Sequence, residues 1–111
     1  MTADELFWEL AEPLLAEPGV TRSTMMGFPC LRLEGRYFAS VDRGAQALLV
    51  KLPADRVTTL IAAGSGAPFA PAGRVFREWL AVPRADRRRW RALLAEARRF
   101  AAAGSTTDAA R

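Results

Sequence analysis

The stretch that decides the fold is VTRSTMMGFPCLRLEGRYFASVDRGAQALLVKL, residues 20–52. Its side chains repeat with a period of two, which is typical of β-strands and not of helices. Only a few residues separate one run from the next, and connections this short join antiparallel neighbours. The pattern therefore predicts four consecutive antiparallel strands, at residues 21–26, 28–33, 37–41 and 47–52.

Helices are expected on either side of these four strands. Residues 2–5, TADE, have the capping-box pattern that begins a helix, and the Pro-Gly pair at 18–19 ends it. A short second helix is expected over residues 53–63. A third is expected between an aspartate N-cap and a terminating glycine, over residues 86–104.

The segment between the second and third helices completes the predicted fold. Residues 64–73 read as a loop, and residues 75–82 alternate as a fifth strand. The order α-β-β-β-β-α-β-α predicts an α+β fold: a two-layer structure with an antiparallel sheet of about five strands and helices on one face. We expect one domain over residues 1–104 and a disordered tail over residues 105–111.

Composition argues against several function classes. The 111-residue chain contains no histidine and one cysteine, which removes the commonest general base and the commonest metal ligand. The nearest approach to a phosphate-binding glycine motif, Gly64-Ser65-Gly66, leads into Ala67-Pro68 rather than into a helix. We therefore expect a protein that is not an enzyme and that has no metal and no cofactor.

Nothing in the sequence predicts a membrane span or a secretory signal. No apolar run approaches the ~20 residues that cross a bilayer. The N-terminus is acidic and lacks the basic start of a signal peptide, and the single cysteine offers no disulfide framework. We expect a cytoplasmic protein.

Charge is distributed unevenly along the chain. Residues 1–73 carry eight acids against six bases, a net charge of −2, whereas residues 74–99 carry nine arginines against three acids, a net charge of +6. At 100° per residue, the core-facing arc of the last helix contains Trp90, Leu93 and Leu94. Six arginines are expected to form a stripe beside that arc: Arg84, Arg87, Arg88, Arg91, Arg98 and Arg99.

Three interpretations of this arginine stripe remain open. It has the geometry of a phosphate-contacting surface, which would indicate nucleic acid. It could instead contact an acidic protein surface. The third interpretation is a solvated or internally paired face, neutralised by the acidic first helix of the same chain or of a dimer mate.

Aromatic and apolar side chains supply two further candidate sites. Phe69, between two prolines of the 64–73 loop, and Trp79 of the fifth strand are expected to line a small-molecule pocket between sheet and loop. Trp8 and Leu15 lie off the core arc of the first helix and are candidates for a homodimer contact. Cys30 follows Pro29 inside an apolar strand and is expected to be buried and structural, since no histidine can deprotonate it.

Three segments in succession carry a family resemblance. They are MMGFPCLRLEGRYFASV at 25–41, LLVKLPAD at 48–55 and GAPFAPAGRVFREWLAVP at 66–83. In this order and spacing they resemble the N-terminal domain of TfoX (Sxy)-type competence regulators and, more broadly, the YjbR/MmcQ-like proteins. The resemblance implies a two-layer α+β fold like that of type III secretion chaperones.

The same resemblance implies a function through binding. Members are described as transcriptional co-regulators or DNA-binding proteins. The leading expectation is therefore a regulatory or adaptor domain that contacts protein or nucleic acid through the last helix. The alternative is a small-molecule-binding domain that uses the pocket at Phe69 and Trp79.

Overall fold

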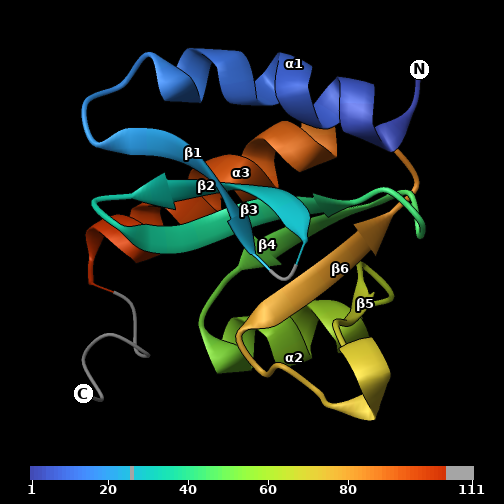
Figure 1. Cartoon of the computed structure of the whole chain (residues 1–111). Coiled ribbons are helices and arrows are strands. Elements are labelled where there is room, and N and C mark those ends of the chain that lie inside the picture. The colour runs from blue at the N-terminus through green and yellow to red at the C-terminus, as the bar shows by residue number, and fades with distance from the viewer. Residues whose placement is uncertain (26, 105–111) are drawn as a thin grey trace.

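The alternating stretch forms the larger part of a six-stranded antiparallel sheet (Figure 1). The structure is a computed structural model that describes residues 1–25 and 27–104. The strand order across the sheet is β1-β2-β3-β4-β6-β5, so the first four strands pair as consecutive hairpins, as predicted. The strands are β1 (Val20–Met25), β2 (Phe28–Leu33), β3 (Arg36–Asp42), β4 (Ala47–Lys51), β5 (Ala67–Pro68) and β6 (Trp79–Pro83).

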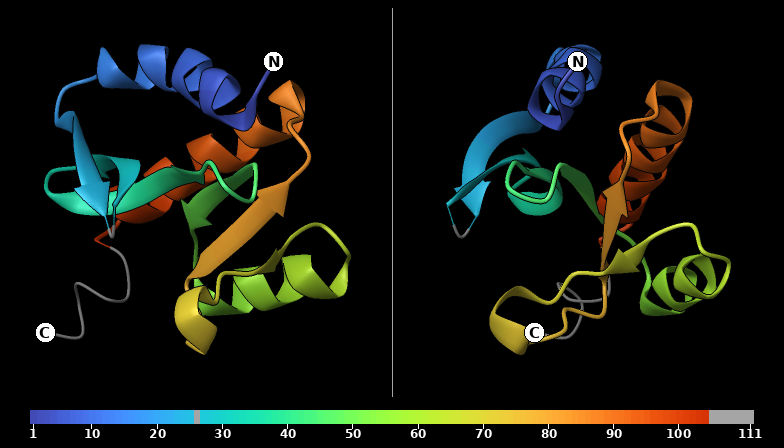
Figure 2. Two further views of the ribbon diagram at one scale, coloured as in Figure 1. Left: turned by 45° about the vertical axis from the view of Figure 1, so that its right-hand side comes forward. Right: turned by 90° about the vertical axis from the view of Figure 1, so that its right-hand side faces the viewer.

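Three α-helices cover one face of the sheet. They are α1 (Ala3–Leu15), α2 (Ala54–Ala62) and α3 (Arg87–Ala102). The right-hand view of Figure 2 shows these helices on one side of the strands and the segment around η1 (Pro71–Gly73) on the other. The predicted α+β fold is confirmed, with six strands instead of about five, because the two residues of β5 are too few to produce a periodic signal.

The strand register builds the core between the sheet and the helices. Leu31, Ala39, Val50 and Leu80 are successive cross-strand partners, and all four are buried. α3 packs on β3 and β4, and its Trp90 is fully buried in the same cluster. At roughly 25 cal/mol per Å² of buried apolar surface, this contact is the main stabilising contribution of α3.

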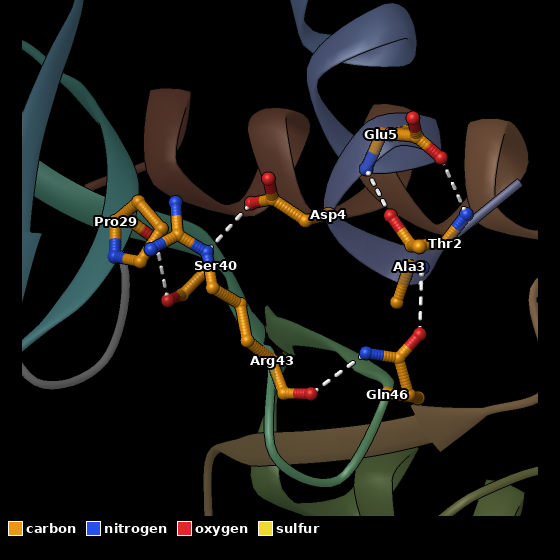
Figure 3. A network of polar contacts seen from close by, with 8 residues as sticks. All are labelled: Thr2, Ala3, Asp4, Glu5, Pro29, Ser40, Arg43 and Gln46. Carbon is orange, nitrogen blue, oxygen red and sulfur yellow. Dashed lines mark hydrogen bonds and ion pairs between the residues drawn. The ribbon is translucent and has the colours of Figure 1, made fainter.

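Polar contacts fix the start of α1 against the hairpin between β3 and β4 (Figure 3). The capping box predicted at residues 2–5 is present. The Ala3 N–H donates to Gln46 Oε1 at 3.0 Å, and Gln46 Nε2 donates to the Arg43 carbonyl at 2.7 Å. The Arg43 Nε donates to Asp4 Oδ1 at 2.9 Å. The first turn of α1 is therefore held both by its own cap and by the hairpin.

One predicted strand boundary and the placement of one stripe arginine were wrong. The fifth predicted strand, 75–82, begins only at Trp79, because the Phe76 N–H bonds to the Phe69 carbonyl at 3.0 Å and the two rings pack 5.6 Å apart. The last helix begins at Arg87 after its Asp86 cap, so Arg84 is not on it. The predicted tail at 105–111 lies outside the described residues.

Substitutions of Trp90 test how α3 is held. Its indole Nε1 is buried without a hydrogen-bond partner among the described residues. Trp90→Phe keeps most of the ring and removes that unpaired N–H, so we expect the free energy of unfolding to change by about 1 kcal/mol or less. Trp90→Ala should lose about 3–5 kcal/mol. Urea unfolding followed by circular dichroism measures both, and equal losses would contradict a contribution carried by ring burial.

Candidate functional site

Acidic α1 lies beside basic α3 and pairs with it at two places. Arg87 Nη2 lies 2.7 Å from Glu9 Oε2, and Arg98 pairs with Glu17, just beyond the end of α1. Both members of the first pair are more than 40% exposed, so solvent screens the attraction. Two of the six stripe arginines are thus internally paired, as the third interpretation of the stripe expects.

The remaining stripe arginines carry no ion pair among the described residues. Arg88, Arg91 and Arg99 are exposed, and no ion pair joins them to any residue among those described. Arg84 lies in the turn before the helix, with a left-handed φ of 68°. Its placement on the helical stripe was therefore wrong, and α3 carries five of the six predicted arginines.

An apolar groove of about 450 Å³ runs between α1 and α3. Pro13 on α1 and Ala95 on α3 are among its lining residues, and their side chains are short or cyclic. Among the residues that the structure describes, Arg91 is the only basic one that lines it. The lining consists of Glu9, Leu10, Pro13, Leu14, Arg91, Leu94 and Ala95.

Arg91 occupies the middle of the paired edge of α3. It follows Arg87 by four residues and precedes Arg98 by seven, and both spacings return to the same side of a helix. Its neighbours on that side pair with Glu9 and Glu17, while Arg91 itself lines the groove. The arrangement combines apolar area with one unpaired guanidinium, which suits an apolar ligand segment carrying a carboxylate.

The opposite face of the sheet carries a smaller apolar cluster. Phe69 and Trp79 are buried there together with Leu49. A concavity of about 340 Å³ under the 67–71 segment is lined by Phe69 and Phe28, among others, but not by Trp79. Trp79 lines a different concavity of about 390 Å³. The structure therefore brings the two predicted pocket residues into one cluster but not into one pocket.

The two candidate dimer residues are largely engaged within the chain. Trp8 is half-buried, packs edge-on against Phe7 at 4.9 Å, and has the Arg22 guanidinium 4.2 Å from its ring centre. Leu15 is half-buried against the main core. Their role in a homodimer stays a prediction.

Two further candidate residues have structural surroundings. Cys30 is fully buried, and burial raises the pKa of its thiol, with a smaller opposing effect from Arg32. Glu78 Oε1 lies 4.0 Å from Lys51 Nζ, and both side chains are mostly buried.

Sequence reasoning missed two contributions to these sites. The groove residues Leu14 and Ala95 gave no signal beyond helical periodicity. Arg89 is not among the six arginines of the predicted stripe, yet its Nη2 is buried and has no hydrogen-bond partner among the described residues. The sequence feature that could have identified Arg89 is its position in the first turn of a helix, where a basic residue is unusual and where the Asp86 side chain already serves as the N-cap.

Neither a metal centre nor a membrane span is found in the described part of the chain. No group of three or more His, Cys, Asp or Glu side chains within residues 1–25 and 27–104 could hold a metal ion. No helix in the same residues is long and apolar enough to cross a membrane. Comparison with protein-family models, with curated proteins and with solved structures gives no match.

The buried thiol predicts slow alkylation and a pH effect on stability. Native Cys30 should react with iodoacetamide only as fast as the protein opens, whereas the urea-unfolded chain should react at once. Because burial raises its pKa in the folded state, the unfolded chain loses the thiol proton first. Stability should therefore be constant below the ordinary thiol pKa of 9.0 and fall as pH rises above it. Cys30→Ala is the control and should lack this contribution; rapid native labelling would contradict burial.

Proposed function

We propose that this chain is a non-enzymatic adaptor domain that binds an acidic, amphipathic protein segment in the groove between α1 and α3. The observation that carries the proposal is the groove itself, which is lined mainly by apolar side chains and by one arginine, Arg91, with which no described acid forms an ion pair. Helices that lay an apolar face into such grooves are a recurrent mode of protein recognition.

Charge favours a protein partner over nucleic acid. A phosphate-tracking surface needs a continuous row of free cations, because each phosphate contact releases counterions. Here Glu9 and Glu17 interrupt the row, and Glu12 is exposed on α1 close to the groove residue Pro13. A partner with mixed apolar and acidic side chains matches Leu14, Leu94 and Arg91 without bringing a phosphate row next to these carboxylates.

The family resemblance agrees with a role in binding. The TfoX N-terminal and YjbR-like proteins that segments 25–41, 48–55 and 66–83 resemble are described as regulators. The proposed adaptor role is consistent with a regulator, because it consists of a protein contact through α1 and α3 and includes no catalytic step.

A second candidate function is small-molecule binding on the opposite face. The concavity under the 67–71 segment, about 340 Å³, is of the size that takes a small apolar ligand. Phe28 and Phe69, whose ring centres lie 6.3 Å apart, supply aromatic walls. This observation favours a ligand at Phe69 and assigns no part to Trp79.

The adaptor proposal is tested with a labelled designed peptide. The probe is a 16-residue amphipathic helix with leucines at positions i, i+3 and i+7 and glutamates on its flanks; its counterpart carries lysines instead. Fluorescence anisotropy should give binding of the acidic peptide only, and Arg91→Glu should raise its Kd about tenfold. Ala95→Trp, which fills the groove, should abolish binding.

A matched control separates groove binding from general charge. Arg77→Glu makes the same charge change at an exposed residue that does not line this groove, and it should leave the Kd unchanged. Equal loss in Arg77→Glu and Arg91→Glu would overturn the proposal. So would duplex DNA binding that weakens steeply between about 50 and 200 mM salt while the peptide fails to bind.

The second candidate is tested with an apolar fluorescent dye, 1-anilinonaphthalene-8-sulfonate. Saturable dye binding that Phe69→Ala weakens about tenfold, with Ala95→Trp without effect, would support a ligand under the 67–71 segment. Dye binding that Ala95→Trp removes and Phe69→Ala leaves intact would assign the apolar site to the groove instead.

A further inference from the structure

A cavity on the other side of α3 from the groove is lined by two arginines. It has a volume of about 250 Å³, which is the space of roughly eight waters at about 30 Å³ each. Its lining comes from the loop after α2, the end of β6 and the first turn of α3 with the residues just before it. Its lining residues are Gly64, Ser65, Gly66, Ala67, Val82, Pro83, Arg84 and Arg89.

The guanidinium of Arg89 has a nitrogen without a hydrogen-bond partner. This nitrogen, Nη2, is buried and makes no hydrogen bond to any described residue. A buried donor without an acceptor loses its hydration and gains nothing, so such groups point to a missing water or ion. Here the group is charged, which makes an anion the better acceptor.

Neighbouring groups of the chain do not accept a hydrogen bond from Arg89 Nη2. Asp86 accepts from the Arg89 backbone N–H at 3.1 Å as the N-cap of α3. Near the end of α2, the Leu60 carbonyl accepts from the Ser65 N–H at 2.8 Å and the Ile61 carbonyl accepts from the Gly64 N–H at 3.0 Å. None of the described groups accepts from the buried Nη2.

The charged side chains that line the cavity are all basic among the described residues. Arg84 and Arg89 line it, and none of the described lining residues is acidic. Ser65 adds a hydroxyl to the lining, and Gly64, where an added Cβ would meet nothing within 4 Å, leaves the backbone open to a ligand. Two guanidinium groups and a hydroxyl around a compact space match the oxygens of a phosphate group.

We propose that this cavity binds the phosphate group of a small phosphomonoester, with Arg89 and Arg84 as its cationic contacts. The site is separate from the groove between α1 and α3, because no residue in the described part of the chain lines both. A monoester fits better than a phosphodiester, since its dianion balances both arginines.

The test measures thermal unfolding in inorganic phosphate against sodium chloride of equal ionic strength. The midpoint of the full chain should rise with phosphate in a saturable way that yields a Kd. Arg89→Met should raise that Kd by about tenfold or more. In chloride alone the same variant should unfold at an equal or higher temperature than the parent, because the unpaired buried donor is gone.

Controls separate a site from a general salt effect. Arg99→Met removes an exposed arginine of the same helix and should keep the full phosphate response. Glycerol phosphate should act like phosphate, and dimethyl phosphate, which imitates a nucleic-acid backbone, should act at least about tenfold more weakly. An unsaturated response shared by the parent and Arg89→Met would be the general effect of phosphate on stability and would overturn the proposal.

Amide spectra of the parent chain provide a second reading that needs no variant. Phosphate should shift the amide resonances of residues 64–67 and 84–89 and leave those of residues 9–14 unchanged. Shifts confined to residues 9–14 and 91–98 would place the anion at the groove and overturn the assignment to this cavity.

Discussion

Trp90 is fully buried against the sheet, and α3 rests on β3 and β4 through it. That contact fixes the rotation of α3 about its own axis, because a bulky ring cannot leave the core without opening a cavity. Once the rotation is fixed, it determines which neighbouring element each charged residue of α3 faces. Arg87 meets α1, Glu96 accepts from Arg56 of α2 at 2.7 and 3.2 Å, and Arg89 faces the loop after α2.

Most of the fold could be predicted because its information is local. Hairpins with very short connections leave antiparallel pairing as the one solution, and the cap at residues 2–5 is complete within four residues. The errors occur where distant residues decide. The 75–77 segment leaves the sheet because Phe76 packs on Phe69, seven residues earlier, and periodicity holds no information on that contact. Arg84 has a φ of 68°, a backbone conformation that the sequence pattern around it does not predict.

The candidate sites were less predictable for a related reason. Helical angles correctly separated Trp90 from the arginines, and the acidic character of the first helix correctly suggested internal pairing. The groove depends on how far apart two helix axes lie, which follows from packing at Pro13 and Ala95 rather than from their positions in the sequence. Phe69 and Trp79 share a cluster but line different concavities, which their positions in the sequence do not reveal.

The number of arginines in α3 does not indicate which of them contributes to a binding site. Arg87 and Arg98 pair with Glu9 and Glu17 near the surface, where such a pair contributes about 0–1 kcal/mol. Arg89 Nη2 is buried without a hydrogen-bond partner among the described residues, so it loses its hydration without gaining an acceptor. The phosphate group that we propose for the neighbouring cavity would supply that acceptor. Arg89, which lies off the stripe, is therefore the arginine of α3 that best indicates a binding site. The indication comes from the missing partner of its Nη2 and not from the number of charges around it.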